Sequence, residues 1–201
     1  VGGGGPLLNH YRALSDQYLG RREKRYIHPP ALHPGMEAVA APRGYVVRAA
    51  KREDLREVIR LNRENLPENY SEDFFEEVLE TNPESFLVAE EESRPDRLVG
   101  YIMCRVEIGF PLLGRGPIVK RGHVISIAVA PEHRRKGVGT ALMIGGMNAL
   151  RSRGCSEVYL EVRVGNEPAI SLYRKLGFRV VRRIPGYYRD GEDAFVMARS
   201  L

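Results

Sequence analysis

The sequence has few cysteines and lacks any long apolar run, and each absence excludes a class of protein. Its 201 residues contain two cysteines, Cys104 and Cys155, whose placement forms neither a disulfide framework nor a metal-binding motif. The five histidines are scattered, so we predict no metal site. No apolar stretch approaches the ~20 residues of a membrane span. The glycine-rich N-terminus also lacks the apolar region of a signal peptide, and we therefore expect a cytoplasmic protein with no membrane partner.

The two commonest phosphate-binding loops are also missing. There is no G-x-x-x-x-G-K-[ST] run, which nucleotide hydrolases need, and no G-x-G-x-x-G fingerprint of dinucleotide-binding folds. A net charge of +5 suits an anionic ligand. Aromatic and basic residues do not interleave over a long stretch as they do in single-strand binders, so we expect no DNA partner.

The chain does contain a buried-strand pattern that leads through a basic glycine loop into a helical pattern. Residues 123–129 are a short apolar run rich in β-branched residues, which Pro131 ends. Loop glycines let a phosphate approach the unpaired N–H groups of a first helical turn, where the helix dipole adds positive charge. In isolation such a loop would be a basic surface turn, but the flanking strand and helix favour a pyrophosphate site. Its predicted residues are Arg134, Arg135, Lys136, Gly137, Val138, Gly139 and Thr140.

The run S-I-A-V-x-P-x-x-R-R-K-G-V-G-x-x-L resembles the acetyl-CoA-binding core of the GCN5-related N-acetyltransferase (GNAT) superfamily. Within that superfamily it is most similar to archaeal protein N-terminal acetyltransferases, relatives of the NatA catalytic subunit and of RimI. The resemblance implies acetyl-CoA as cosubstrate and a GNAT domain over residues 43–201. Residues 1–42 are then a flexible or loosely ordered extension. Backbone N–H groups on the strand segment Ile127, Ala128 and Val129 could polarise the thioester carbonyl.

A second motif follows this core. Apolar and polar residues alternate over 157–163, which predicts a strand with one apolar face. Asn166 is placed to cap the next helix, with Pro168 in its first turn and Gly177 after its end. The string N-x-P-A-I-x-L-Y-x-K-L-G-F resembles the GNAT segment in which an Asn and a Tyr approach the pantetheine and the thiol. The resemblance implies that Asn166 contacts the cofactor and that Tyr173 gives a proton to the departing sulfur.

Acyl transfer to an amine also needs a base. An α-amino group has an unperturbed pKa of about 7.7–8.0, so a modest base, direct or through one water, is sufficient. The candidates are His123, at the entrance of the central strand, and Glu161, on the polar face of the neighbouring strand. In the archaeal relatives that the sequence resembles, the matching residues hold a water that takes the proton. Without the resemblance, His123 would be a core histidine and Glu161 the ion-pair partner of Arg121 or Arg163.

Two further loops resemble those that surround the peptide in NatA-type enzymes. L-P-E-N-Y at 66–70 is similar to the loop that shapes the pocket for the first residue, which implies that Glu68 senses the substrate N-terminus. A solvated glutamate in a turn between helices is an equal alternative. Y-Y-x-D-G-E-D-A-x-x-M at 187–197 is similar to a loop over the incoming peptide. The residues that these loops place in substrate binding are Leu66, Glu68, Tyr70, Tyr187 and Tyr188.

The pattern between these motifs predicts one domain with a mixed α/β sheet flanked by about four helices. Helices are expected over 51–65, from the N-cap Ser71 to about 81, over 138–152 and after Asn166; strands over 45–48, 85–90, 98–108, 123–129 and 157–163 and near the end, with a turn at 94–97. The helix 138–152 is apolar almost all round, so it should be buried, with Gly145 and Gly146 allowing close approach to the sheet. His133 should be exposed and inert.

Together these features predict an acetyl-CoA-dependent protein N-terminal acetyltransferase. We expect it to act on Ser-, Ala- or Met-type N-termini by direct attack in a ternary complex. A RimI-like ribosomal-protein acetyltransferase and a lysine or small-amine acetyltransferase are the rival enzymes. A rival from another class is a noncatalytic GNAT-fold module that docks on RNA or the ribosome through the basic N-terminal extension. Both halves of the cofactor site are intact, which argues against that module.

Overall fold

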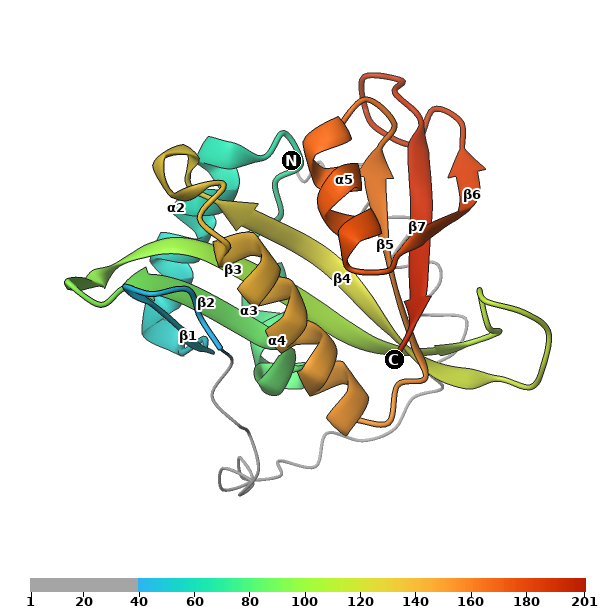
Figure 1. Cartoon of the computed structure of the whole chain (residues 1–201), viewed down its shortest axis with the longest axis horizontal. Coiled ribbons are helices and arrows are strands. Elements are labelled where there is room, and N and C mark those ends of the chain that lie inside the picture. The colour runs from blue at the N-terminus through green and yellow to red at the C-terminus, as the bar shows by residue number, and fades with distance from the viewer. Residues whose placement is uncertain (1–39) are drawn as a thin grey trace. The chain divides into compact units, whose positions relative to one another are not determined.

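The computed structural model describes residues 40–201, so the predicted extension lies almost wholly outside the described part of the chain. The described part contains a seven-stranded sheet and four α-helices (Figure 1). In chain order these are β1 (Tyr45–Ala49), α2 (Leu55–Asn65), α3 (Glu72–Thr81), β2 (Phe86–Glu91), β3 (Arg94–Gly109), β4 (Val119–Val129), α4 (Val138–Ser152), β5 (Glu157–Arg163), α5 (Glu167–Lys175), β6 (Arg179–Ile184) and β7 (Ala194–Ser200). None of the helices within 40–201 has the length and apolar character needed to cross a membrane.

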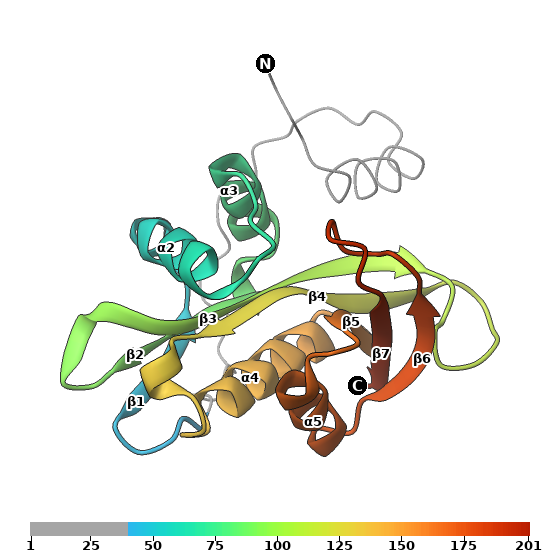
Figure 2. The same cartoon turned by 90° about the horizontal axis from the view of Figure 1, so that it is seen from above.

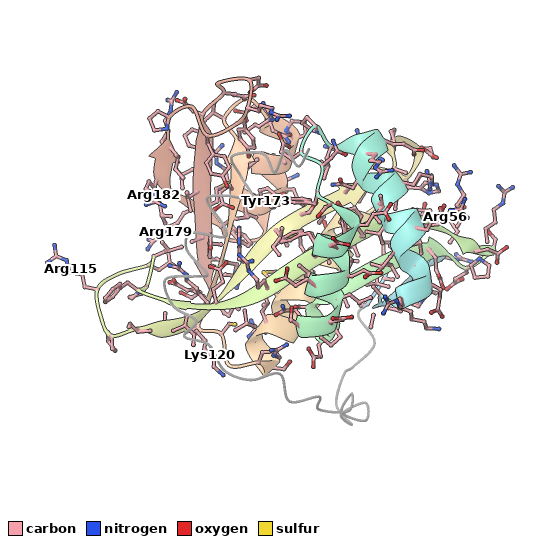
Figure 3. The ribbon with its side chains drawn as sticks, turned by 180° about the vertical axis from the view of Figure 1, so that it is seen from behind. Arg56, Arg115, Lys120, Tyr173, Arg179 and Arg182 are labelled. Carbon is pink, nitrogen blue, oxygen red and sulfur yellow. The ribbon has the colours of Figure 1, made fainter. Side chains whose placement is uncertain are left out.

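The sheet is mixed, as predicted. Its strand order is β1-β2-β3-β4-β5-β7-β6, and every neighbouring pair is antiparallel except β4 and β5, which run parallel. A parallel pair needs a crossover connection, and α4 supplies it. The long β3–β4 hairpin carries Arg115 near the tip of its loop, which projects from one end of the sheet (Figure 3).

Helices cover both faces of the sheet. Figure 2 shows α2 and α3 on one face and α4 and α5 on the other. Two apolar clusters correspond to these layers: one joins α4 and α5 to the sheet around Leu142 and Ile170, the other joins α2 and α3 around Leu61 and Phe75. Each of these four side chains is fully buried, and the burial of each stabilises the fold by roughly 1.5–3 kcal/mol.

Local capping rules predicted the helix ends well. The Ser71 hydroxyl accepts a hydrogen bond from Phe74 N–H, and Asn166 Oδ1 accepts one from Ala169 N–H. Helix α4 begins and ends where the apolar pattern predicted. A Cβ added at Gly146 would lie 3.1 Å from Ile102 Cδ1, so the predicted close approach of α4 to the sheet is confirmed there.

Four local expectations were wrong. The segment 94–97 is the start of β3 and not a turn, because the chain reverses two residues earlier, over 92–93. Strand β6 was missed, since its exposed, arginine-rich sequence pairs on one edge only and shows no clear alternation. His133 is buried and not exposed: its ring packs edge-on against Tyr45, and its Nδ1 lies 3.0 Å from the Tyr45 hydroxyl. Ile144 is the one large apolar side chain of α4 that is exposed.

Candidate active site

Strands β4 and β5 pair over a short distance and then separate (Figure 1). Arg121–His123 lies opposite Glu157–Tyr159 in parallel register. Beyond these residues β4 continues to Val129 and β5 to Arg163, and the described chain forms no further pair between them. The separation leaves one side of β4 without a strand partner, and this opening lies in the middle of the sheet.

The backbone of β4 can be assigned to its two sides by strand alternation. The Ala130 N–H donates to a carbonyl of β3, and so the backbone groups of Ala128 also face β3. The Val129 carbonyl instead accepts a hydrogen bond from Arg134 Nε, which places it on the opposite side. Of the three predicted strand residues, Ile127 and Val129 therefore direct their N–H groups into the opening.

The loop before α4 leaves the helix N-terminus accessible. Gly137 is the N-cap residue with φ of 86°, and Arg135 has φ of 63°, both in the left-handed region. No side chain caps the helix, and its first turn contains no acidic residue. A Cβ added at Gly139 would make only ordinary van der Waals contacts, the nearest 3.6 Å from Leu172 Cδ2, so the first turn is not tightly packed at this position. These features fit a bound pyrophosphate.

The predicted cradle residues divide into two groups. Arg134 holds the loop in place, because Nε donates to Val129 O at 2.9 Å and Nη2 to Asn65 Oδ1 at 3.1 Å. Arg135 and Lys136 are exposed and can supply charge to an anion. Val138 is buried and Thr140 half-buried, so these two offer mainly backbone groups.

His123 lies between two carboxylates at the closed end of the opening. Its Nε2 is 2.6 Å from Glu161 Oε2, and its Nδ1 is 3.3 Å from Glu107 Oε1. The ring stacks on Tyr159 with centroids 4.4 Å apart and is only 1% exposed. The structure thus brings the two predicted base candidates, His123 and Glu161, into direct contact. Arg121 and Arg163, the alternative partners of Glu161, pair elsewhere.

The electrostatics distinguish the two candidates. Burial opposes protonation of His123, but the charge of Glu161 and the hydrogen bond to Glu107 outweigh it and raise the pKa of His123 to about 9. At neutral pH the ring is an imidazolium and has no lone pair with which to accept a proton. The Glu161 side chain is 16% exposed, so of the two candidates it is the one that a substrate amine can reach.

Tyr173 and Asn166 come from α5. Tyr173, labelled in Figure 3, is buried in the cluster that joins α4 and α5 to the sheet, and burial raises its pKa to about 12. It is therefore a neutral phenol that can donate a proton. Asn166 Oδ1 is occupied as the helix cap, so its first contribution is to fix the start of α5.

The loop between α2 and α3 packs beside β4, on the face of the sheet that these two helices cover. The Tyr70 hydroxyl donates to Ile125 O at 3.3 Å, and both Leu66 and Tyr70 pack against the apolar cluster of this face. Asn62 Nδ2 donates to Glu68 O at 3.2 Å, which ties the loop to α2. The L-P-E-N-Y segment is accordingly held by both the helix and the central strand.

Arg163 connects that loop to the one between β6 and β7. Its Nη2 donates to Glu68 Oε1 at 2.6 Å, and its Nη1 donates to Asp190 and Glu192 at 2.7 Å each. The guanidinium also lies over the ring of Tyr188, 4.1 Å from its centroid. Glu68 and Tyr188, predicted from two separate motifs, thus meet through an arginine that neither motif contains.

The two tyrosines of the second loop differ in exposure. Tyr188 is 8% exposed, whereas Tyr187 is half-buried and packs edge-on against it at 5.0 Å. Burial and the nearby Glu68 charge raise the pKa of Tyr188, so its hydroxyl stays protonated. Tyr187 is the more accessible of the pair to a peptide.

Sequence reasoning missed Glu107 and assigned Arg163 a different partner. Glu107 and Arg105 occupy alternate positions of β3, which is the signal of one polar strand face. Their register against His123 depends on an irregularity between Met103 and Cys104, which has no mark in the sequence. The partner of Arg163 depends on how two loops fold over β5, which strand periodicity does not encode.

A parallel strand pair that opens in mid-sheet, with a glycine-led helix N-terminus beside it, defines the GNAT class of acyltransferase folds. Residues 55–178 match the acetyltransferase (GNAT) family, and the chain belongs to it. It is therefore an enzyme of the acyltransferase class, and acetyl-CoA is its acetyl donor.

Curated relatives and solved structures agree with this family. The N-alpha-acetyltransferase of Sulfurisphaera tokodaii is 48% identical over 170 residues, which are 83% of this chain and 100% of the relative. The structure of Ard1 from Thermoplasma volcanium is similar with a TM-score of 0.67 and 28% identity, over 79% of this chain and 98% of that one. Naa20 from Chaetomium thermophilum, solved with a bisubstrate analogue, has a TM-score of 0.68 and 29% identity, over 78% and 86%.

Proposed function

We propose that this chain transfers the acetyl group of acetyl-CoA to the α-amino group of protein N-termini, of the Ser, Ala or Met type, by direct attack within a ternary complex. The observation that carries the proposal is the position of Glu161 and His123 at the closed end of the β4–β5 opening. From there a base reaches an amine placed in the opening, while the α4 N-terminus holds the donor's diphosphate. The name of the Sulfurisphaera tokodaii relative, N-alpha-acetyltransferase, supports the α-amino group as the acceptor.

The reaction requires one bond to form and one to break. The amine nitrogen bonds to the acetyl carbon, and the bond from that carbon to sulfur breaks. Of the two protons that an ammonium loses, one passes through Glu161 to solvent and the other ends on the sulfur, delivered by Tyr173. The Ile127 and Val129 N–H groups polarise the thioester carbonyl as it gains negative charge. Arg135, Lys136 and the first-turn N–H groups hold the diphosphate.

The peptide enters between the two loops that Arg163 joins. Leu66 and Tyr70 line the pocket for its first residue, Tyr187 contacts its backbone, and Tyr188 shapes the pocket wall. Glu68 acts on the substrate ammonium through its charge while paired to Arg163, since Coulomb attraction extends beyond a single contact. The basic extension 1–42 is where we expect ribosome contact.

A peptide panel tests the proposal. The protein is incubated with acetyl-CoA and peptides that begin with Ser, Ala or Met-Glu, and release of free thiol is followed with time. Each peptide contains an internal lysine, and the matched control is the same peptide already acetylated at its N-terminus. We expect thiol release with free N-termini and background release with the control. Equal rates with both would point to a lysine acetyltransferase, and no release with any amine would favour a binding module.

A further inference from the structure

Glu107 is a half-buried carboxylate to which the proposed reaction assigns no role. It lies on β3, where its Oε1 is 2.7 Å from Arg105 Nη2 and 3.3 Å from His123 Nδ1. Its Oε2 accepts a hydrogen bond from the Tyr159 hydroxyl at 2.6 Å, and Arg121 Nη2 lies 3.7 Å away. Two strands besides its own therefore fix this carboxylate in one orientation.

The geometry around His123 specifies its protonation state. Both ring nitrogens face a carboxylate oxygen, Glu107 on one side and Glu161 on the other. A neutral imidazole has a single N–H, so only the imidazolium can donate to both. The ring cannot turn away, because it is stacked on Tyr159 with an angle of 3° between the planes.

The charges that face this ring are of both signs. Glu107 and Arg105 approach from β3, and Glu161 and the Tyr159 phenol approach from β5. Arg121, on the ring's own strand, lies over Tyr159 and near Glu107. Burial alone would raise the pKa of Glu107, but its contacts with His123 and Tyr159 reverse this and lower it. The histidine and the carboxylate thus stabilise each other's charge.

We propose that Glu107 is a positioning residue for acetyl transfer: with Tyr159 it holds His123 as an imidazolium whose Nε2–H stays on Glu161. His123 then cannot be the base, and Glu161 alone accepts the proton of the substrate amine. The inference rests on the proposed function, because it assigns roles within the same site. Exposure agrees with it, since the His123 side chain is 1% exposed and that of Glu161 is 16% exposed.

Glu107→Gln tests the role, because it removes the charge and keeps the shape. The first measurement is the titration of His123 by NMR after nitrogen-15 histidine labelling, assigned with the His123→Gln variant. We expect the midpoint to fall by at least about one pH unit, the usual effect of losing an opposite charge in contact. We also expect kcat/KM for a peptide at neutral pH to fall by roughly tenfold, with KM for acetyl-CoA unchanged.

Two further variants separate this role from damage to the fold. Glu107→Asp keeps the charge, so the His123 midpoint should stay near the wild-type value and part of the activity should return. Glu90→Gln is the matched control, because Glu90 is a carboxylate on β2 that pairs with Arg48 and not with His123, and its side chain is 11% exposed against 19% for Glu107. It should leave the His123 titration unchanged.

The outcomes distinguish this inference from the proposed function. Wild-type protein that acetylates no peptide overturns the proposed function. An active wild type whose His123 midpoint is unchanged in Glu107→Gln overturns the role of Glu107 only. A lowered midpoint with full activity in the same variant also overturns it, because His123 protonation would then be irrelevant to the reaction.

Discussion

Arg163 Nη2 donates to Glu68 Oε1 at 2.6 Å, and this contact joins the central sheet to the loop before α3. The two side chains are 18% and 22% exposed, so the pair is shielded from water over most of its surface. Arg163 Nη1 also binds Asp190 and Glu192. One guanidinium therefore sets the distance between two loops that we place on either side of the peptide.

Replacing Arg163 should weaken peptide binding more than cofactor binding. In Arg163→Met the stem is kept but three acidic partners lose their cation and repel one another. We expect KM for a peptide to rise by roughly tenfold or more, equivalent to about 1.4 kcal/mol. The measurement is steady-state kinetics with each substrate varied in turn.

Arg183→Met is the control for that experiment. Arg183 pairs with Asp193 in the same loop, but its side chain is 60% exposed, and surface pairs of this kind contribute little. A similar rise in KM in both variants would show that the loop tolerates no change of charge, and the specific role of Arg163 would be lost.

Glu68 should influence which first residue is preferred. Glu68→Ala removes a carboxylate from the loop that we propose shapes the pocket, and it leaves Arg163 with its two other acidic partners, so the loop loses one ion pair and one negative charge. We expect the ratio of kcat/KM values for Ser-, Ala- and Met-Glu peptides to change. A profile that keeps the same ratios at a lower overall rate would reduce Glu68 to a structural ion-pair partner.

The sequence predicted most of the secondary structure, because local rules determine it. Helix α4 and strand β5 agree with prediction at both ends, since an apolar pattern and a glycine or a cap mark each boundary. Strand β6 was missed because it is an exposed edge, where packing imposes no alternation on its arginines. The turn at 92–93 was misplaced because Pro95 in an edge region suggested a turn two residues too late.

The sequence named several residues of the candidate site, but it missed Glu107 and did not show which residues contact one another. His123 and Glu161 could be named from their strands, but the identity of the base depends on Glu107, which reaches His123 only through the β3–β4 register. Arg134 looked like a phosphate ligand from its place in the loop. The structure shows that it contacts Val129 and Asn65 and that Arg135, the next residue, is left-handed, a conformation that a sequence rarely reveals for a residue other than glycine.

Glu161→Gln should reduce turnover far more than it weakens acetyl-CoA binding. The amide keeps a hydrogen-bond acceptor for His123 Nε2–H but cannot take a proton from the amine. General-base catalysis typically contributes about 10²–10⁴-fold, and we expect a loss of kcat within that range. Calorimetry should give an unchanged dissociation constant for acetyl-CoA. Wild-type kcat in this variant would remove Glu161 from the mechanism.

A carboxylate placed at the start of α4 should separate cofactor binding from stability. Gly139 lies in the first turn, and a Cβ added there would make only ordinary van der Waals contacts, with Leu172 Cδ2 and Val129 Cγ2 nearest at 3.6 and 3.8 Å. In Gly139→Asp the helix dipole favours the new negative charge by about 0.3–1 kcal/mol, so the melting temperature should hold or rise. The same charge occupies the N–H groups that a diphosphate needs and repels it.

We therefore expect the dissociation constant for acetyl-CoA, measured by calorimetry, to increase by at least about tenfold in Gly139→Asp, or 1.4 kcal/mol. Gly139→Ala is the matched control, because it adds the Cβ without charge and should leave affinity within a few-fold of wild type. The two properties move in opposite directions only if the α4 N-terminus binds the diphosphate. Unaltered affinity in a folded Gly139→Asp variant would place the cofactor elsewhere, since an anion and a carboxylate cannot share one set of N–H donors.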